Sequence, residues 1–150
     1  MRSATINGVE AWAEATLDGL LAKGLHQGGA RRAIVDLLGE QDCCLTAPEI
    51  VERLRSSERK VGIASVYRVL DLLVSEGYVQ KIDVGAGTSR YEPIHSSGEH
   101  HHHLVCDSCG KVEPFADGGL ERALGRVEQR SGYDVSVHDV VLHGACDTCP

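Results

Sequence analysis

The stretch Ile63 to Gly77, IASVYRVLDLLVSEG, decides the fold of the N-terminal half of the chain. Its apolar side chains recur at helical spacing, and a glycine follows them as a helix terminator. The apolar positions are Ile63, Val66, Leu70, Leu73 and Val74. We therefore predict an amphipathic helix that packs one face on a core and carries Tyr67 and Arg68 beside that face.

The neighbouring segments predict helices before this stretch and a hairpin after it. Residues 9–25 are rich in Ala, Leu and Glu, and residues 31–38 place apolar side chains at helical spacing. In TAPEIVERLRS (46–56), Thr46 and Glu49 have the spacing of a capping box. The alternating runs YVQKIDV (78–84) and TSRYEPI (88–94) flank the turn Gly85 to Gly87. Helix, helix, helix, hairpin is the order of a winged helix-turn-helix.

A winged helix-turn-helix presents its second motif helix to the major groove of DNA. Ser65, Tyr67 and Arg68 are the candidate contacts, with Arg59 and Lys60 in the basic stretch before them. Tyr packs on thymine or bonds a phosphate, and Arg binds guanine or the backbone. The alternative is that Tyr67 is half-buried packing and Arg68 a solvated charge, because winged helices also bind proteins.

Composition limits the function classes. The 150 residues carry a net charge of −7, which by itself argues against a nucleic-acid partner, although the stretch 53–68 is locally basic. The N-terminus shows neither a secretory signal nor a membrane span, so we expect a cytoplasmic protein with no membrane partner. In a reducing cytosol the six cysteines are expected to hold metal or do chemistry rather than form disulfides.

After Pro93 the sequence changes character. Polar SSGEHHHH (96–103) precedes LVCDSCGKVEPF (104–115) and YDVSVHDVVLHGAC (133–146), which we expect to form strands on either side of a helix over residues 118–132. Leu120, Leu124 and Val127 give that helix an apolar face. The second half is therefore predicted to be a small domain of mixed helices and strands, with the boundary near residues 88–95.

Two Cys-x-x-Cys pairs lie in this second half. Cys106 and Cys109 are separated from Cys146 and Cys149 by 36 residues, and two such pairs complete a tetrahedral zinc site. A site with four protein ligands is closed, so its expected role is structural. A redox dithiol or two unrelated pairs are the alternatives.

The four consecutive histidines enter the strand that precedes the first cysteine pair. Side chains alternate along a strand, so His100 and His102 are expected on one face and His101 and His103 on the other. Each pair needs further ligands, and the candidates are Glu121, His138, His95, Glu92 and Cys44. The alternative is a solvated polyhistidine loop that binds ions adventitiously. An expression tag is rejected because the run is interior.

Three segments resemble the ferric uptake regulator superfamily of metal-sensing bacterial repressors, over about residues 20–150. GIASVYRVLDLLVSEGYV (62–79) looks like its recognition helix, SRYEPIHSSGEHHHHLVCDSCGKVEPF (89–115) like its hinge, histidine tract and first cysteine pair, and LHGACDTC (142–149) like its closing strand and second pair. The resemblance implies an α+β fold with an N-terminal winged helix-turn-helix DNA-binding domain (1–88), a hinge (89–95) and a small α/β dimerisation and metal-binding domain (96–150).

The resemblance also implies roles for single residues. The four cysteines match the structural zinc site, and Tyr67 and Arg68 match the DNA-reading pair. His101 and His103 match the regulatory site between the domains, which a hinge residue and a residue of the first domain usually complete. The positions for that completion are Glu92, His95 and Cys44, and those of a third site are His100, His102, Glu121 and His138.

Two positions depart from the family pattern. His26 stands where a basic residue is usual, which puts a minor-groove contact in doubt, and Gln80 stands where zinc sensors have Asp. The regulatory site is therefore not a simple copy of theirs.

The leading hypothesis is a homodimeric, metal-dependent transcriptional repressor that binds palindromic operator DNA and is not an enzyme. Zinc is favoured as the regulatory ion because Cys44 is a soft ligand, whereas Glu92 permits iron, and nickel or manganese are further alternatives. Two other classes are a zinc hydrolase, with Glu99 or Glu121 as base, and a zinc-buffering module without an operator.

Overall fold

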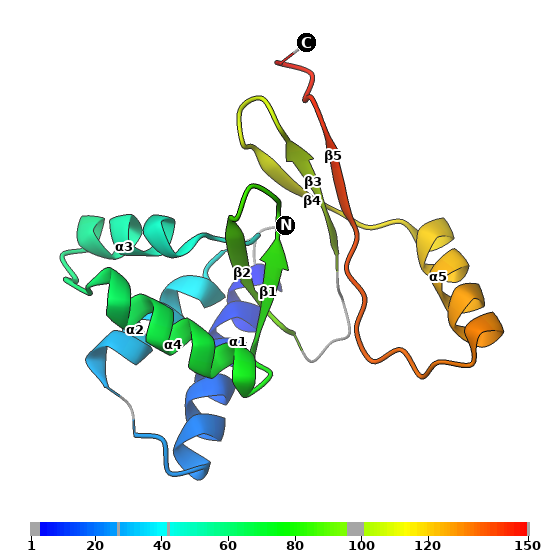
Figure 1. Ribbon diagram of the computed structural model, residues 1–150. Coiled ribbons are helices and arrows are strands. Elements are labelled where there is room, and N and C mark those ends of the chain that lie inside the picture. The colour runs from blue at the N-terminus through cyan, green and yellow to red at the C-terminus, as the bar shows by residue number, and fades with distance from the viewer. Residues whose placement is uncertain (1–3, 27, 42, 96–100, 150) are drawn as a thin grey trace. The chain divides into compact units, whose positions relative to one another are not determined.

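The computed structural model of the protein (Figure 1) describes residues 4–26, 28–41, 43–95 and 101–149. The chain divides into two compact units, residues 1–98 and residues 99–150. Within the described ranges, no helix combines the length and apolar character needed to cross a membrane.

The first unit contains four helices followed by a hairpin, in the predicted order (Figure 1). The elements are α1 (Ala4–Ala22), α2 (Gly29–Gly39), α3 (Ala47–Ser56), α4 (Ile63–Ser75), β1 (Val79–Asp83) and β2 (Ser89–Pro93). Helix α1 begins and ends earlier than the predicted span of 9–25. Its C-terminus is closed by Gly24, whose φ of 78° lets the N–H of Leu25 donate to the carbonyl of Leu20 at 3.0 Å.

The predicted capping box at the start of α3 is confirmed. The N–H of Glu49 donates to the hydroxyl of Thr46 at 3.2 Å, and the N–H of Thr46 donates to the Glu49 carboxylate at 2.8 Å. Two backbone donors that the helix itself leaves unpaired are thereby satisfied. The start of α3, and with it the loop that precedes the helix, is set by local chemistry.

The core of the first unit is aliphatic and is built from all four helices with residues of the hairpin. Val66, Leu70 and Leu73 of α4 are fully buried, as their spacing predicts. Ile63 was expected on the same face and is instead 44% exposed, because it is the first residue of α4 and lies beyond the packed part of the helix. These buried side chains fix the orientation of α4 and so determine which of its residues face outward.

The hairpin supports the segments on either side of it. Strands β1 and β2 are antiparallel, with Val79 opposite Pro93 and Asp83 opposite Ser89. The loop before α3 joins this hairpin, since Leu45 and Tyr91 exchange backbone hydrogen bonds of 2.9 and 2.8 Å. At the end of β2 the indole N–H of Trp12 donates to the carbonyl of Ile94 at 3.1 Å.

The second unit contains a three-stranded sheet and one helix, so the α+β class is confirmed. The elements are β3 (His102–Cys106), β4 (Val112–Phe115), α5 (Gly118–Ser131) and β5 (Val141–Gly144). The strand order is β4-β3-β5, with β3 antiparallel to β4 and parallel to β5. The parallel pairing places the ends of β3 and β5, far apart in sequence, at the same edge.

The strand predicted over residues 133–146 is shorter than expected. Only Val141–Gly144 forms a strand, and residues 133–140 lie outside the sheet ladder. An alternating sequence needs a neighbouring strand to become part of a sheet. Within the described residues, β3 pairs with this segment only over the four residues of β5.

Two residues cap helix α5. The carboxylate of Asp117 accepts the N–H of Leu120 at 2.8 Å at the N-terminus, and Gly132, with a φ of 70°, follows the last helical residue. None of its residues is buried, and Val127 on the predicted apolar face is 60% exposed. The amphipathic face is therefore present but is not covered within the described chain.

Candidate metal centres

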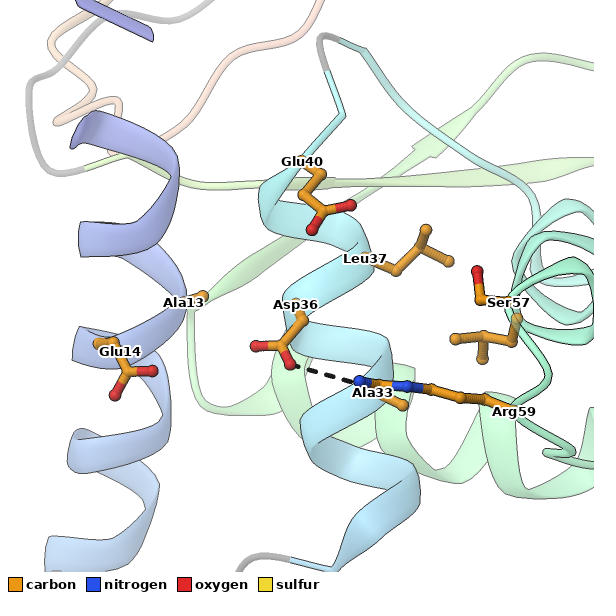
Figure 2. Close-up of a pocket in the computed structure, with 9 residues that line it drawn as sticks. Ala13, Glu14, Ala33, Asp36, Leu37, Glu40, Ser57 and Arg59 are labelled. Carbon is orange, nitrogen blue, oxygen red and sulfur yellow. Dashed lines mark ion pairs between the residues drawn. The ribbon is translucent and has the colours of Figure 1, made fainter. Parts of the chain in front are cut away.

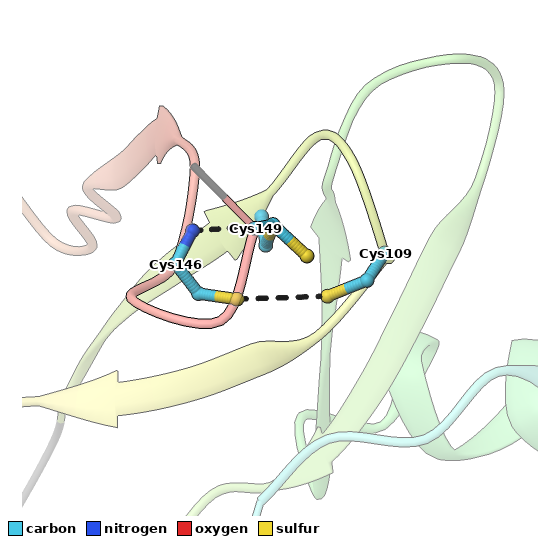
Figure 3. Close-up of side chains that lie close together, drawn as sticks. Cys109, Cys146 and Cys149 are labelled. Carbon is cyan, nitrogen blue, oxygen red and sulfur yellow. Dashed lines mark hydrogen bonds between the residues drawn. The ribbon is translucent and has the colours of Figure 1, made fainter.

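The two cysteine pairs meet at one end of the second unit. Cys106 ends β3 opposite Gly144 of β5, so the turns that follow these strands lie side by side. The four sulfur atoms of Cys106, Cys109, Cys146 and Cys149 all lie within 4.8 Å of one another, and Figure 3 shows three of these side chains converging. The Cys109 and Cys146 sulfurs are 3.8 Å apart. Zinc–sulfur bonds of about 2.3 Å in a tetrahedron place sulfurs about 3.8 Å apart, so the donor set fits zinc.

Backbone groups prepare these sulfurs to hold a cation. Hydrogen bonds from the N–H groups of Cys146 and Cys109 lower the pKa of the Cys106 thiol to about 6, and the Cys146 N–H lies 3.3 Å from the Cys106 sulfur. The hydroxyl of Thr148, 3.1 Å from the Cys146 sulfur, lowers the pKa of that thiol. The sulfurs of neighbouring cysteines raise the pKa of Cys149 to about 12. The lowered pKa values of Cys106 and Cys146 favour their thiolate forms, and a divalent ion neutralises that negative charge.

The first turn of this cluster depends on Gly110. Its φ of 76° lies in the left-handed region, and its N–H donates to the carbonyl of Cys106 at 2.8 Å. This closes the loop so that Cys109 turns back toward Cys106.

The histidines that the structure describes alternate along β3 as predicted. The rings of His101 and His103 have centroids 5.1 Å apart, so they lie on the same side of the strand. The ring of His102 packs instead near His138 and Phe115, with centroids 5.5 Å from each. His100 lies outside the described residues, so its pairing with His102 stays a prediction.

A second donor cluster forms around Glu121 in the first turn of α5. Its carboxylate lies 2.6 Å from Nε2 of His102 and 3.0 Å from Nε2 of His138. The N–H of Val140 lies 3.3 Å from Nδ1 of His102 and orients the ring toward Glu121. One atom from each of the three side chains lies within 4.8 Å of the others, a carboxylate and imidazole set suited to a divalent transition metal.

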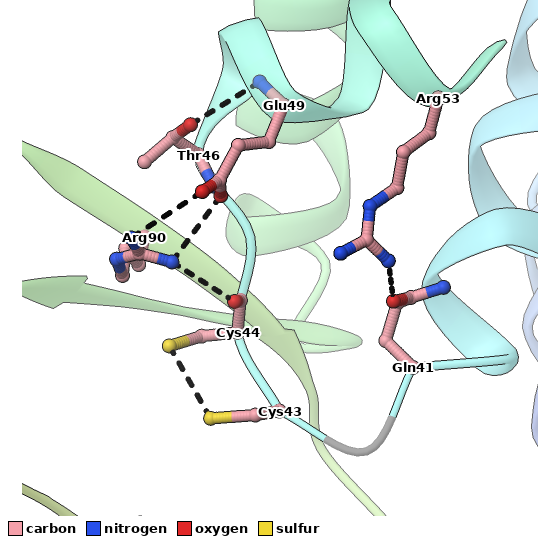
Figure 4. A network of polar contacts seen from close by, with 7 residues as sticks. All are labelled: Gln41, Cys43, Cys44, Thr46, Glu49, Arg53 and Arg90. Carbon is pink, nitrogen blue, oxygen red and sulfur yellow. Dashed lines mark hydrogen bonds and ion pairs between the residues drawn. The ribbon is translucent and has the colours of Figure 1, made fainter. Parts of the chain in front are cut away.

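The remaining predicted ligands belong to the first unit. Glu92 lies on β2 and is buried, while His95 follows the strand and is exposed. Cys44 lies in the loop before α3, is buried, and has its thiol pKa raised by a hydrogen bond with Cys43 and by burial. The two sulfurs are 3.6 Å apart, and Figure 4 shows the two side chains facing each other. Sequence reasoning missed Cys43, although the doubled cysteine was a visible signal.

The predicted DNA-contacting residues lie on α4 and before it, and all but the half-buried Ser65 are exposed. Tyr67 is 44% exposed, and the guanidinium of Arg68 donates to the hydroxyl of Ser65 at 3.1 Å. Lys60 is exposed, whereas Arg59 lies 3.9 Å from the carboxylate of Asp36. More than half of the Tyr67 surface is covered, so both the DNA contact and the half-buried packing stay predictions for this residue. The guanidinium of Arg59 lies beside the Asp36 carboxylate, which competes with a phosphate for it.

Arg59 also borders a cavity of about 450 Å³ among the first three helices (Figure 2). Its described lining mixes small apolar side chains with charges and contains neither His nor Cys: Ala13, Glu14, Ala33, Asp36, Leu37, Glu40, Leu54, Ser57 and Arg59. The donor clusters described above are thus separate from this cavity.

Known proteins with similar sequences and structures share one family. The profile of the ferric uptake regulator family matches residues 22–143. The ferric uptake regulation protein of Legionella pneumophila is 36% identical over 105 residues, which cover 70% of this chain and 76% of the relative. That of Bacillus subtilis is 33% identical over 114 residues, covering 75% and 76%.

Among solved structures, the ferric uptake regulator of Helicobacter pylori, described as having three functional metal-binding sites, superimposes with a TM-score of 0.78 at 28% identity, covering 94% of this chain and 93% of that one. A zinc-bound manganese uptake regulator superimposes with a TM-score of 0.67 at 26% identity, covering 93% and 98%. The matched profile, the identities and the shared fold agree: this chain belongs to the ferric uptake regulator family of metal-dependent transcription regulators.

Proposed function

We propose that this protein is a transcriptional repressor that binds palindromic operator DNA as a homodimer when a regulatory ion, with zinc favoured, is bound. The observation that carries the proposal is the division of metal donors along β3: His101 and His103 on one side, His102 with Glu121 and His138 on the other, and Cys106 at its end. These donor groups are separate, so one can hold a permanent structural ion while another binds an exchangeable regulatory ion.

The four-cysteine cluster is proposed to hold the permanent zinc. Its sulfur geometry supports a closed tetrahedral site, in which no position is left for substrate. Bound there, zinc supplies a cross-link between the ends of β3 and β5. This argues against a hydrolase at this cluster, because hydrolytic zinc needs an open position.

The regulatory ion is proposed to bind His101 and His103, with Glu92, His95 and a cysteine of the first unit as the further ligands indicated by the family resemblance. Within the first unit, burial and the raised pKa of Cys44 disfavour it as a thiolate. Cys43 is half-buried and adjacent, so we propose Cys43 as the better sulfur donor in place of Cys44. The His102, Glu121 and His138 cluster, with His100, is proposed as a further site.

Zinc is favoured for the regulatory ion because a thiolate beside imidazoles is a soft donor set that suits zinc. Iron is the second candidate, supported by the carboxylate of Glu92 and by relatives named as ferric uptake regulation proteins. Binding of the ion acts through differential affinity: it stabilises the conformer whose recognition helices match the operator, and operator binding strengthens ion binding by the same factor.

A second copy of the chain is the proposed partner of the uncovered apolar surface. None of the residues of helix α5 is buried, and Val127 on its apolar face is exposed. In the segment that follows the helix, Tyr133 is 76% exposed and Val137 is 72% exposed. Alternating apolar residues outside a ladder are suited to pairing with a neighbouring strand. A dimer of this kind presents two α4 helices to half-sites about one DNA turn apart.

Loss of the structural zinc is expected for Cys146→Ser. Replacing one of four sulfurs opens the site, so we expect zinc content after mild chelation to fall by about one equivalent per chain, measured by elemental analysis. Cys43→Ser is the matched control and keeps that ion. Unchanged zinc in Cys146→Ser would exclude a four-cysteine zinc site.

Val137→Asp is expected to weaken the dimer. A carboxylate on the exposed apolar surface must be desolvated on association, so sedimentation equilibrium at micromolar concentration should shift toward the single-chain mass. Leu21→Asp places the same charge on an exposed position of α1 and should leave the mass unchanged. Equal masses for Val137→Asp and the parent chain would place the interface elsewhere.

Arg68→Ala and Tyr67→Ala are expected to reduce affinity for DNA from the protein's own promoter, each by about 1–3 kcal/mol. Both side chains are exposed on α4, so metal content and folding should be preserved. Arg130→Ala on α5 removes an equal charge from an exposed position and serves as the control. Full binding by both α4 variants would favour a zinc-buffering or protein-binding module.

A titration of the same DNA affinity against buffered free Zn²⁺, Fe²⁺, Ni²⁺ and Mn²⁺ identifies the regulatory ion. We expect Zn²⁺ to act at the lowest free concentration and to raise affinity about 5- to 150-fold, the usual range of allosteric coupling. His103→Ala should lose this response. His143→Asn, which lies outside the donor clusters beside Asp107, should keep it. Equal DNA binding with and without a chelator that spares the structural zinc contradicts metal dependence.

A further inference from the structure

Cys43 and Cys44 form a pair of thiols that is distinct from the four-cysteine cluster. They are consecutive residues in the loop between α2 and α3, and their sulfurs are 3.6 Å apart, within contact distance (Figure 4). Two sulfurs on adjacent residues commonly point apart along an extended chain. In this loop they point the same way.

The two thiols differ in access to solvent. Cys43 is half-buried, and Cys44 is only 4% exposed. A small oxidant therefore reaches the Cys43 sulfur first, and the Cys44 sulfur waits beside it, shielded from the same oxidant. This is the arrangement of an attacking and a resolving cysteine.

The surrounding contacts hold Cys44 in place. Its carbonyl lies 3.3 Å from the guanidinium of Arg90, which also lies 3.2 Å from the carboxylate of Glu49. The next residue, Leu45, is joined to Tyr91 of β2 by two backbone hydrogen bonds. The backbone of Cys44 is thus held to the hairpin and to the start of α3.

We propose that Cys43 and Cys44 are a modification site, a dithiol that a hydroperoxide converts reversibly to a disulfide between adjacent residues. The Cys43 thiolate attacks the peroxide oxygen, the O–O bond breaks, and water or an alcohol leaves with Cys43 as a sulfenic acid. The Cys44 thiol gives up its proton and its sulfur attacks the Cys43 sulfur, the S–O bond breaks, and the hydroxyl leaves with that proton as water. Both sulfurs are oxidised by two electrons in total, and the peroxide is reduced by the same two.

Reversibility follows from the short span of the bridge. The Cα atoms of consecutive residues are about 3.8 Å apart across a trans peptide, below the usual range of about 4.4–6.8 Å for a disulfide. A bridge closed over one peptide bond is strained, and strained disulfides are the readily reduced, regulatory kind. Small thiols therefore restore the dithiol.

The consequence for regulation rests on the proposed function. Oxidation uses the Cys43 sulfur that we assign to the regulatory ion, so the oxidised protein loses a soft ligand while the structural zinc stays in place. Peroxide then weakens metal-dependent DNA binding without dismantling the fold.

The test uses the full-length, zinc-loaded protein treated with hydrogen peroxide, followed by alkylation of free thiols and digestion with trypsin. Cleavage after Arg32 and Arg53 yields AIVDLLGEQDCCLTAPEIVER (33–53), which holds both cysteines of the pair and none of the other four. We expect this peptide to appear unalkylated and about 2 Da lighter than its dithiol form, and to recover two alkyl groups after reduction. Full alkylation of this peptide, while peptides of the four-cysteine cluster are oxidised and zinc is released, overturns the proposal.

Cys44→Ser is the matched control. Without the resolving sulfur, Cys43 should stop at sulfenic acid and be trapped by dimedone, with no internal bridge in the peptide. Dimedone labelling that is absent from Cys43 in this variant contradicts the assignment of Cys43 as the attacking residue.

DNA affinity is measured on the same oxidised sample at saturating Zn²⁺. We expect a loss of about 5- to 150-fold that reduction reverses. The mass measurement does not depend on DNA binding, so a chain that forms the bridge but never binds its promoter refutes the proposed function and leaves the modification site supported.

Discussion

The parallel pairing of β3 with β5 is the constraint on which the second unit depends. It places Cys106 opposite Gly144, and so brings together two cysteine pairs that are 36 residues apart in the chain. Of the described residues 101–149, only His102, His103, Val105 and Cys106 are buried. A unit of this size with so little apolar interior needs additional links. A metal ion held by four sulfurs and an uncovered apolar face that suits a second chain are the two that its residues offer.

The same strand also sorts the metal donors. Successive side chains of β3 point to opposite sides, so His102 meets Glu121 and His138 while His101 and His103 lie together away from them. One short run of histidines therefore serves more than one donor set without the rings competing for the same ion. Glu121 contributes because Asp117 caps α5 and fixes where its first turn begins.

The first unit follows a different physical principle. Its aliphatic core orients α4 and leaves Tyr67 and Arg68 facing outward, and hydrogen bonds of the backbone attach the loop of Cys43 and Cys44 to β2. The buried core and the backbone hydrogen bonds of the loop hold these side chains in place.

The sequence by itself determined the features that depend on near neighbours along the chain. Helical spacing predicted α4, the Thr46 and Glu49 box predicted the start of α3, strand alternation predicted the grouping of the described histidines, and motif order predicted the family. Only the tertiary structure decided which residues of each pattern are buried or paired. Ile63, the first residue on the apolar face of α4, is exposed, and the alternating residues 133–140 lack a neighbouring strand. It also decided that Cys44 is buried while the adjacent Cys43 is half-buried. The spacing of residues determines which side of a helix or strand each side chain occupies. Whether that side is buried, and which residues it contacts, depends on distant segments of the chain that pack against it.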